Sequence, residues 1–118
     1  MSKIRVEMSL KSKDDNLHII SEGINSGNRI NYGEEDVKVT LIVSSEKVEM
    51  ERVAKEYRVH LVFSISKKEL STYKLIGHDE FILNVETKLL EISENEIKID
   101  YILENNEFSY VLNMEDLW

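Results

Sequence analysis

The chain has 118 residues and a formal net charge of −8, with 42% hydrophobic and 32% charged residues. This length and balance suit one globular domain with its own core and are unlike a disordered segment. The negative charge opposes binding to nucleic acid or to an anionic membrane, and the absence of cysteine excludes disulfides and Cys-type zinc sites.

Alternation of apolar and polar residues with a period of two predicts strands along most of the chain. The first strand contains Ile4, Val6, Met8 and Leu10, which alternate with charged or small polar residues. The same period recurs at residues 37–43, 59–65, 81–85, 90–92, 97–103 and 108–114. Polar clusters with the composition of turns separate these runs at residues 13–16, 25–28, 44–46, 66–69, 77–79, 94–96 and 104–107.

Short turns of this kind make sequential strands pair antiparallel, because a parallel crossover needs a dozen or more residues. The sequence therefore predicts one all-β domain over residues 1–118, an up-and-down meander of about eight to ten strands. An open sheet of that size would leave two unpaired edges and an uncovered apolar face. We therefore expect a closed or nearly closed antiparallel barrel.

Residues 46–57 are consistent with two structures. Met50, Val53, Ala54 and Tyr57 have the spacing of a helical stripe, and the segment is rich in helix-forming residues. Alternatively, Val48, Met50 and Arg52 lie on one face of a strand, with a turn at residues 54–56. Residue propensity slightly favours the helix.

A series of short motifs runs through the chain: Gly23, Tyr32, residues 48–52, residues 61–63, Tyr73, Gly77, residues 85–87 and residues 97–101. With the order of the predicted elements, this series resembles the YwiB-like family of bacterial proteins, a domain of unknown function with a calycin-type, lipocalin-like barrel. The resemblance covers nearly the whole chain and implies a strand at residues 47–53. The chain departs from the family pattern at Ala54, where glycine is expected after the arginine, so the turn geometry there is an open question. The family has no assigned activity, so the resemblance implies a fold only.

The chain lacks the features of an exported protein. Residues 1–7 interrupt their apolar side chains with charges, so they do not form the apolar segment of a signal peptide. No apolar run approaches the roughly 20 residues that a membrane-spanning helix needs. Because small secreted domains often depend on disulfides, a chain without cysteine favours the cytoplasm.

No catalytic motif is present, whether GxSxG, P-loop, GxGxxG or HExxH. The histidines at positions 18, 60 and 78 are not at metal-binding spacing, and we interpret His60 and His78 as surface residues. Carboxylates gather at residues 34–36 and at Glu49 with Glu51. A solvated loop or strand face explains them better than an acid–base pair or a weak divalent-cation site. We expect no cofactor and no metal.

Polar side chains at inward-facing strand positions are the candidate binding residues. Arg52 shares a face with Val48 and Met50, and a buried guanidinium needs a carboxylate partner from the protein or from a ligand. A calycin-like barrel can hold one small ligand in its interior. Alternatively, these residues are structural, with Arg52 paired to an internal Glu and the tyrosine hydroxyls bonded to backbone. The candidate set is Arg52, Tyr32, Thr87 and Tyr101.

Three functions follow from this pattern, in decreasing order of preference. The first is a non-enzymatic binding module that holds a small apolar or amphipathic molecule, for example a carboxylate, inside the barrel. The second is a structural or interaction protein with a filled core, in which Tyr110, Met114, Leu117 and Trp118 form a homodimer patch. The third is an enzyme, for which no nucleophile with a base is apparent.

Overall fold

The computed structural model describes residues 1–66 and 69–117 and confirms an all-β fold. The described residues form eleven strands, where about eight to ten were expected, and contain no helix that could span a membrane. The strands are β1 (Ser2–Ser12), β2 (Asn16–Ser26), β3 (Arg29–Glu34), β4 (Val37–Val43), β5 (Lys47–Val53), β6 (Tyr57–Ser64), β7 (Ser71–Leu75), β8 (Glu80–Leu83), β9 (Val85–Ile92), β10 (Glu96–Leu103) and β11 (Asn106–Asp116).

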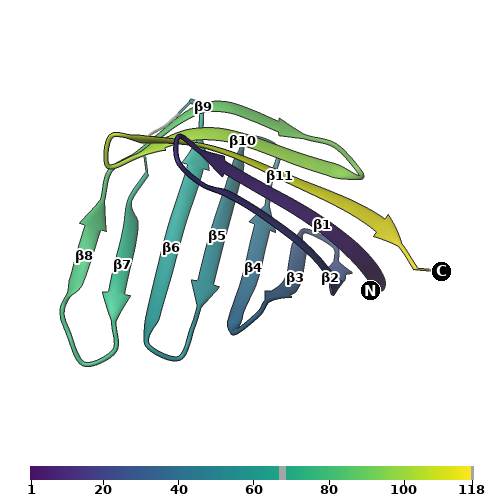
Figure 1. Ribbon diagram of the computed structural model, residues 1–118. Coiled ribbons are helices and arrows are strands. Elements are labelled where there is room, and N and C mark those ends of the chain that lie inside the picture. Colours follow the sequence, from purple (N-terminus) through teal and green to yellow (C-terminus); the bar gives the residue numbers. More distant parts are fainter. Residues whose placement is uncertain (67–68, 118) are drawn as a thin grey trace.

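All eleven strands belong to one antiparallel sheet, in the order β8-β7-β6-β5-β4-β3-β2-β1-β11-β10-β9. The sheet folds over on itself, so that β1 and β9–β11 cross above β3–β8 (Figure 1). Strand β6 contacts β9 across the remaining gap, where the Ser64 N–H donates a 3.1 Å hydrogen bond to Thr87 Oγ1. Hairpin β7–β8 extends beyond this seam. The barrel is therefore nearly closed, as the sequence predicted.

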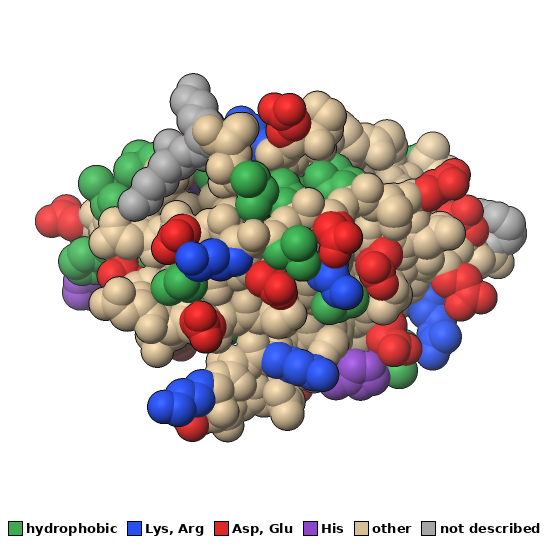
Figure 2. Space-filling view, turned by 90° about the horizontal axis from the view of Figure 1, so that it is seen from above, with side chains coloured by type: hydrophobic (Ala, Val, Ile, Leu, Met, Phe, Trp, Pro, Cys, Tyr) green, Lys and Arg blue, Asp and Glu red, His purple; other side chains and the backbone are tan. Residues whose placement is uncertain are grey.

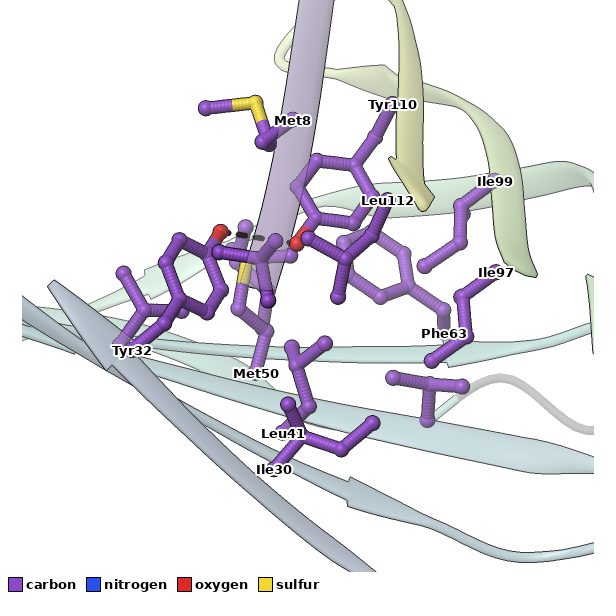
Figure 3. Packing of buried hydrophobic residues seen from close by; sticks show 14 of the residues in the cluster. Met8, Ile30, Tyr32, Leu41, Met50, Phe63, Ile97, Ile99, Tyr110 and Leu112 are labelled. Atoms are coloured by element: carbon purple, nitrogen blue, oxygen red, sulfur yellow. Dashed lines mark hydrogen bonds between the residues drawn. The ribbon is translucent and has the colours of Figure 1, made fainter. Parts of the chain in front are cut away.

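The inward-facing residues of the two layers form a single apolar core, because every second side chain of each strand points to the interior. Tyr110, Phe63, Met8 and Met50 lie at its centre and are almost fully buried. The rings of Phe63 and Tyr101 are tilted, with centroids 4.7 Å apart, and join the layers near the seam. Side chains thus pack against one another through the interior of the barrel (Figure 3).

The segment at residues 46–57 is a strand and a turn, as the family resemblance implied. Strand β5 pairs along its whole length with β4 and β6, and the Ala54 N–H donates to the Tyr57 carbonyl across the turn. The helical interpretation is wrong because the sheet offers backbone partners on both edges of this segment. Tertiary pairing outweighs the modest helix propensity of the residues.

Gly23 allows β2 to turn from one layer of the barrel to the other. It pairs with Ile4 on β1 and with Tyr32 on β3, at the first residue pair that joins β2 to β3. A Cβ at this position would overlap the carbonyl oxygen of Asn31 and lie 3.0 Å from Tyr32 Cβ. Only glycine permits the two strands to approach this closely.

Candidate functional site

A buried ion pair between Arg52 and Glu34 occupies one end of the barrel interior. The Arg52 guanidinium donates from Nη1 to Glu34 Oε2 at 3.1 Å and from Nη2 to Glu34 Oε1. The Glu34 side chain is only 3% exposed and that of Arg52 is 19% exposed. Two-point contact of this kind is the strong geometry for a guanidinium and a carboxylate. The carboxylate expected opposite Arg52 is thus supplied by the protein.

Two tyrosines extend this ion pair into the core. The Tyr32 hydroxyl donates to Glu34 Oε2 at 2.7 Å and lies 2.9 Å from the Tyr110 hydroxyl (Figure 3). Because Tyr32 gives its one proton to Glu34, Tyr110 is the donor of the second bond. The resulting network, Tyr110–Tyr32–Glu34–Arg52, ties β11 in one layer to β3 and β5 in the other. These tyrosine hydroxyls therefore bond to side chains, where the structural alternative expected backbone partners.

Burial controls the protonation of the tyrosines in this network. It raises the pKa of Tyr32, and the neighbouring Tyr110 and Glu34 raise it further. Burial likewise raises the pKa of Tyr110, which stays above its usual value despite the hydrogen bond to Tyr32. For Arg52, burial lowers the pKa, but hydrogen bonding and attraction to Glu34 outweigh burial and raise it overall. At neutral pH the tyrosines are therefore neutral and Arg52 is charged.

Of the remaining candidates, Tyr101 is near this network and Thr87 belongs to the seam. Burial raises the pKa of Tyr101 to about 12, and the positive charge of Arg52 partly opposes this rise. Tyr101 also stacks on Phe108, with ring centroids 5.3 Å apart. Thr87 pairs with Tyr101 across β9 and β10, next to a register shift at residues 100–101, but its hydroxyl accepts from Ser64. Thr87 therefore serves barrel closure.

Glu34 is the central residue that the sequence analysis assigned incorrectly. It was interpreted as part of a solvated acidic loop at residues 34–36, and it is the buried acceptor of the network. The available signal was parity, because Ile30, Tyr32 and Glu34 alternate along β3 and all three are buried. Among the described residues, no group of three or more His, Cys, Asp or Glu side chains is placed to hold a metal ion.

A row of inward-facing side chains leads from Arg52 to the free end of the sheet. Strand register places Arg52 beside Val59, Val59 beside Tyr73, and Tyr73 beside Phe81. Paired residues in antiparallel strands lie on the same face, so this row follows the inner face of β5–β8. Arg52, Val59 and Tyr73 are partly buried, and Phe81 at the end of the row is 53% exposed. Tyr57 stacks against Tyr73 with ring centroids 6.0 Å apart and widens the aromatic surface.

Two open cavities are each lined in part by a candidate residue, the first by Tyr101 and the second by Tyr32. The larger, of about 1050 Å³, is lined by residues from the β1–β2 turn, β9 and the β10–β11 hairpin, among them Lys11, Lys88, Asp100 and Ser109. The other, of about 710 Å³, follows the close approach of β2 and β3 around Gly23. Figure 2 shows that acidic and basic side chains are interspersed on the outward face of the upper layer.

Two of the four residues expected to form a homodimer patch near the C-terminus are buried, so the expectation is wrong for Tyr110 and Met114. Tyr110 is 1% exposed and Met114 is 9% exposed, because both alternate inward along β11. Leu117 is 41% exposed, and Trp118 lies outside the described residues.

The histidine interpretations agree with the structure. His60 lies 3.3 Å from Glu49, and His78 is in the β7–β8 turn.

These features, an antiparallel arrangement of strands, a filled core and a buried polar network, define a small, nearly closed β-barrel domain. The chain belongs to the family described as Domain of unknown function (DUF1934), which it matches over residues 3–114. Its structure is similar to the crystal structure of ywiB protein from Bacillus subtilis, with a TM-score of 0.66 and 17% sequence identity. The match covers 97% of this chain and 89% of that one. No curated protein matches the sequence. The family predicted from the residues is thus confirmed.

Proposed function

We propose that this domain is a non-enzymatic binding module for a small amphipathic acid. The acid would lie at the open end of the barrel, with its anionic group at Arg52 and its apolar part along the inner face of β6–β8. The observation that carries this proposal is the row from Arg52 through Val59 and Tyr73 to Phe81, which is partly buried until it ends at the exposed ring of Phe81.

The chemistry of the row supports an amphipathic ligand. A guanidinium has five N–H donors, and two nitrogens of Arg52 contact Glu34, so further donors remain for a second anion. The aromatic side chains of Tyr57, Tyr73 and Phe81 offer apolar area of the kind that lines ligand sites. The core itself is packed with side chains, which favours binding at this end over the centre first expected from the sequence.

The protonation states in the network support binding over catalysis. General acids and bases work best with pKa values near the operating pH. Tyr101 has a pKa of about 12, and burial raises the pKa of Tyr32 and Tyr110. These groups hold protons at neutral pH and orient their neighbours. The interspersed surface charges and the net charge of −8 favour a small ligand over nucleic acid. The cytoplasmic location stays a prediction.

Calorimetric titration with decanoate and with 1-decanol tests the proposal. Decanoate is expected to bind more tightly, because only its head group can pair with Arg52. Phe81→Ser should lower the affinity for both compounds by about fivefold to tenfold, because it removes apolar contact. Ile20→Ser is the matched control, since Ile20 is also 53% exposed but faces outward on β2.

Removal of the guanidinium needs a variant that leaves no orphaned charge. The double variant Arg52→Leu with Glu34→Leu replaces both members of the ion pair and should abolish the preference for decanoate over 1-decanol. The proposal fails if neither compound binds in the millimolar range, or if Phe81→Ser and Ile20→Ser have the same effect. Native mass spectrometry of the purified protein gives an independent reading, as a retained small acid should be lost in the Phe81 variant.

A further inference from the structure

Strand β8 forms a free end of the eleven-stranded sheet. Within the described residues it pairs only with β7, in an unbroken register from Lys74–Glu80 to Ser71–Leu83. The other terminal strand, β9, lies against β6 at the seam. At the end of β8 the free edge stops, because Asn84 receives a hydrogen bond from the Glu104 N–H and donates its own N–H to Glu104 Oε1.

This edge lacks several of the usual protections against strand pairing, although β8 is short and begins with the charged Glu80. Exposed edges are commonly guarded by lysine, proline or a bulge. The four residues of β8 are Glu80, Phe81, Ile82 and Leu83, and their pairing with β7 has no irregularity. Both of its faces are apolar, since Phe81 is 53% exposed on the inner face and Ile82 is 67% exposed on the outer face.

We infer that β8 is an interface for a second copy of this chain, which pairs with it antiparallel about a twofold axis at Phe81. In this register Phe81 lies opposite its own copy, a favourable aromatic cross-strand pair. Each Glu80 lies opposite Ile82 of the other copy, so no carboxylate of the strand faces another. Lys74 lies beside Glu80 on the neighbouring strand and offsets its charge. Local charge thus permits self-association of a chain whose net charge is −8.

The size of the interface sets its strength. A strand of four residues buries less than the roughly 800 Å² per partner of a standard stable interface, so the dimer should be weak and depend on concentration. The inference does not rest on the proposed ligand, because edge pairing uses the backbone of β8, although Phe81 contributes to both surfaces.

Sedimentation equilibrium of the full chain over a range of concentrations tests the pairing. Wild type should dimerise reversibly. Ile82→Glu places a carboxylate opposite Glu80 twice in the dimer and should weaken association roughly tenfold. Ile82→Lys removes the same apolar side chain but places a cation opposite Glu80, and should associate at least as well as wild type. Glu80→Lys combined with Ile82→Glu should restore the dimer.

Three results would overturn the inference. The first is a wild-type protein that remains monomeric up to about 1 mM. The second is a dimer that Ile82→Glu does not weaken, and the third is equal weakening by Ile82→Glu and Ile82→Lys. The last result would indicate apolar association without this register. Decanoate binding by the Ile82→Glu variant should match wild type, which keeps this test separate from that of the proposed function.

Discussion

Loss of Arg52 and loss of Glu34 from the buried ion pair should lower the free energy of unfolding by different amounts. Arg52→Leu leaves the Glu34 carboxylate, 3% exposed, with only the Tyr32 hydroxyl as a donor. Loss of one partner of a buried pair costs about 3–5 kcal/mol of the free energy of unfolding. Glu34→Leu leaves a guanidinium that is 19% exposed and can turn toward water, so its main cost is the Tyr32 hydroxyl left without an acceptor, about 1–3 kcal/mol.

The double variant should be much more stable than the sum of the two single effects predicts. Replacement of both Arg52 and Glu34 by leucine removes the desolvated charges together but leaves the buried Tyr32 hydroxyl without its acceptor, so we expect a free energy of unfolding about 1–3 kcal/mol below that of wild type. Urea denaturation followed by circular dichroism measures all three variants. Glu22→Gln is the control, because the Lys3–Glu22 pair is exposed and should contribute less than about 1 kcal/mol. Single variants no more destabilised than this control would refute the buried network.

Three further predictions concern the frame around this network. Gly23→Ala should destabilise the protein by about 3 kcal/mol in urea denaturation. Gly33→Ala, where a Cβ would meet only the Val37 carbonyl oxygen at 4.0 Å, should change stability little; equal effects would contradict a close approach of β2 and β3. Thr87→Val removes the acceptor of the Ser64 N–H and should cost about 1–3 kcal/mol, and Thr87→Ser should retain most of that stability; no difference between them would exclude this bond from the seam. Stability should fall at alkaline pH, because the pKa of Tyr101 is about 12 in the folded state and 10.0 is its ordinary value. This difference contributes up to about 3 kcal/mol to the free energy of unfolding below pH 10, and the contribution is lost as the pH rises through 12. Absorbance at about 295 nm, with Tyr101→Phe as reference, measures the titration, and a Tyr101 hydroxyl that titrates at about pH 10 in the folded protein would disprove this.

Strands with one polar face could be predicted from the sequence, and the other strands could not. Strand β1 alternates apolar and charged residues, and its prediction is confirmed. Strand β2 was not predicted, because Ile20 and Ile24 on its outer face mask the alternation with inward Ile19. The run at residues 81–85 was read as one strand, but it divides at Asn84, where backbone bonds to Glu104 replace pairing with β7. These hydrogen bonds are set by a distant segment and leave no local pattern.

The sequence by itself determined which side chains face inward, because the period of two in a strand is a local property of the backbone. It therefore predicted a barrel and identified Arg52, Tyr32 and Tyr101 as inward-facing polar residues. Only the tertiary structure decided that Glu34 pairs with Arg52 and that Tyr110 bonds to Tyr32, 78 positions away in the chain. Register between strands and the crossing of two layers bring these groups together, and both depend on the packing of the whole sheet.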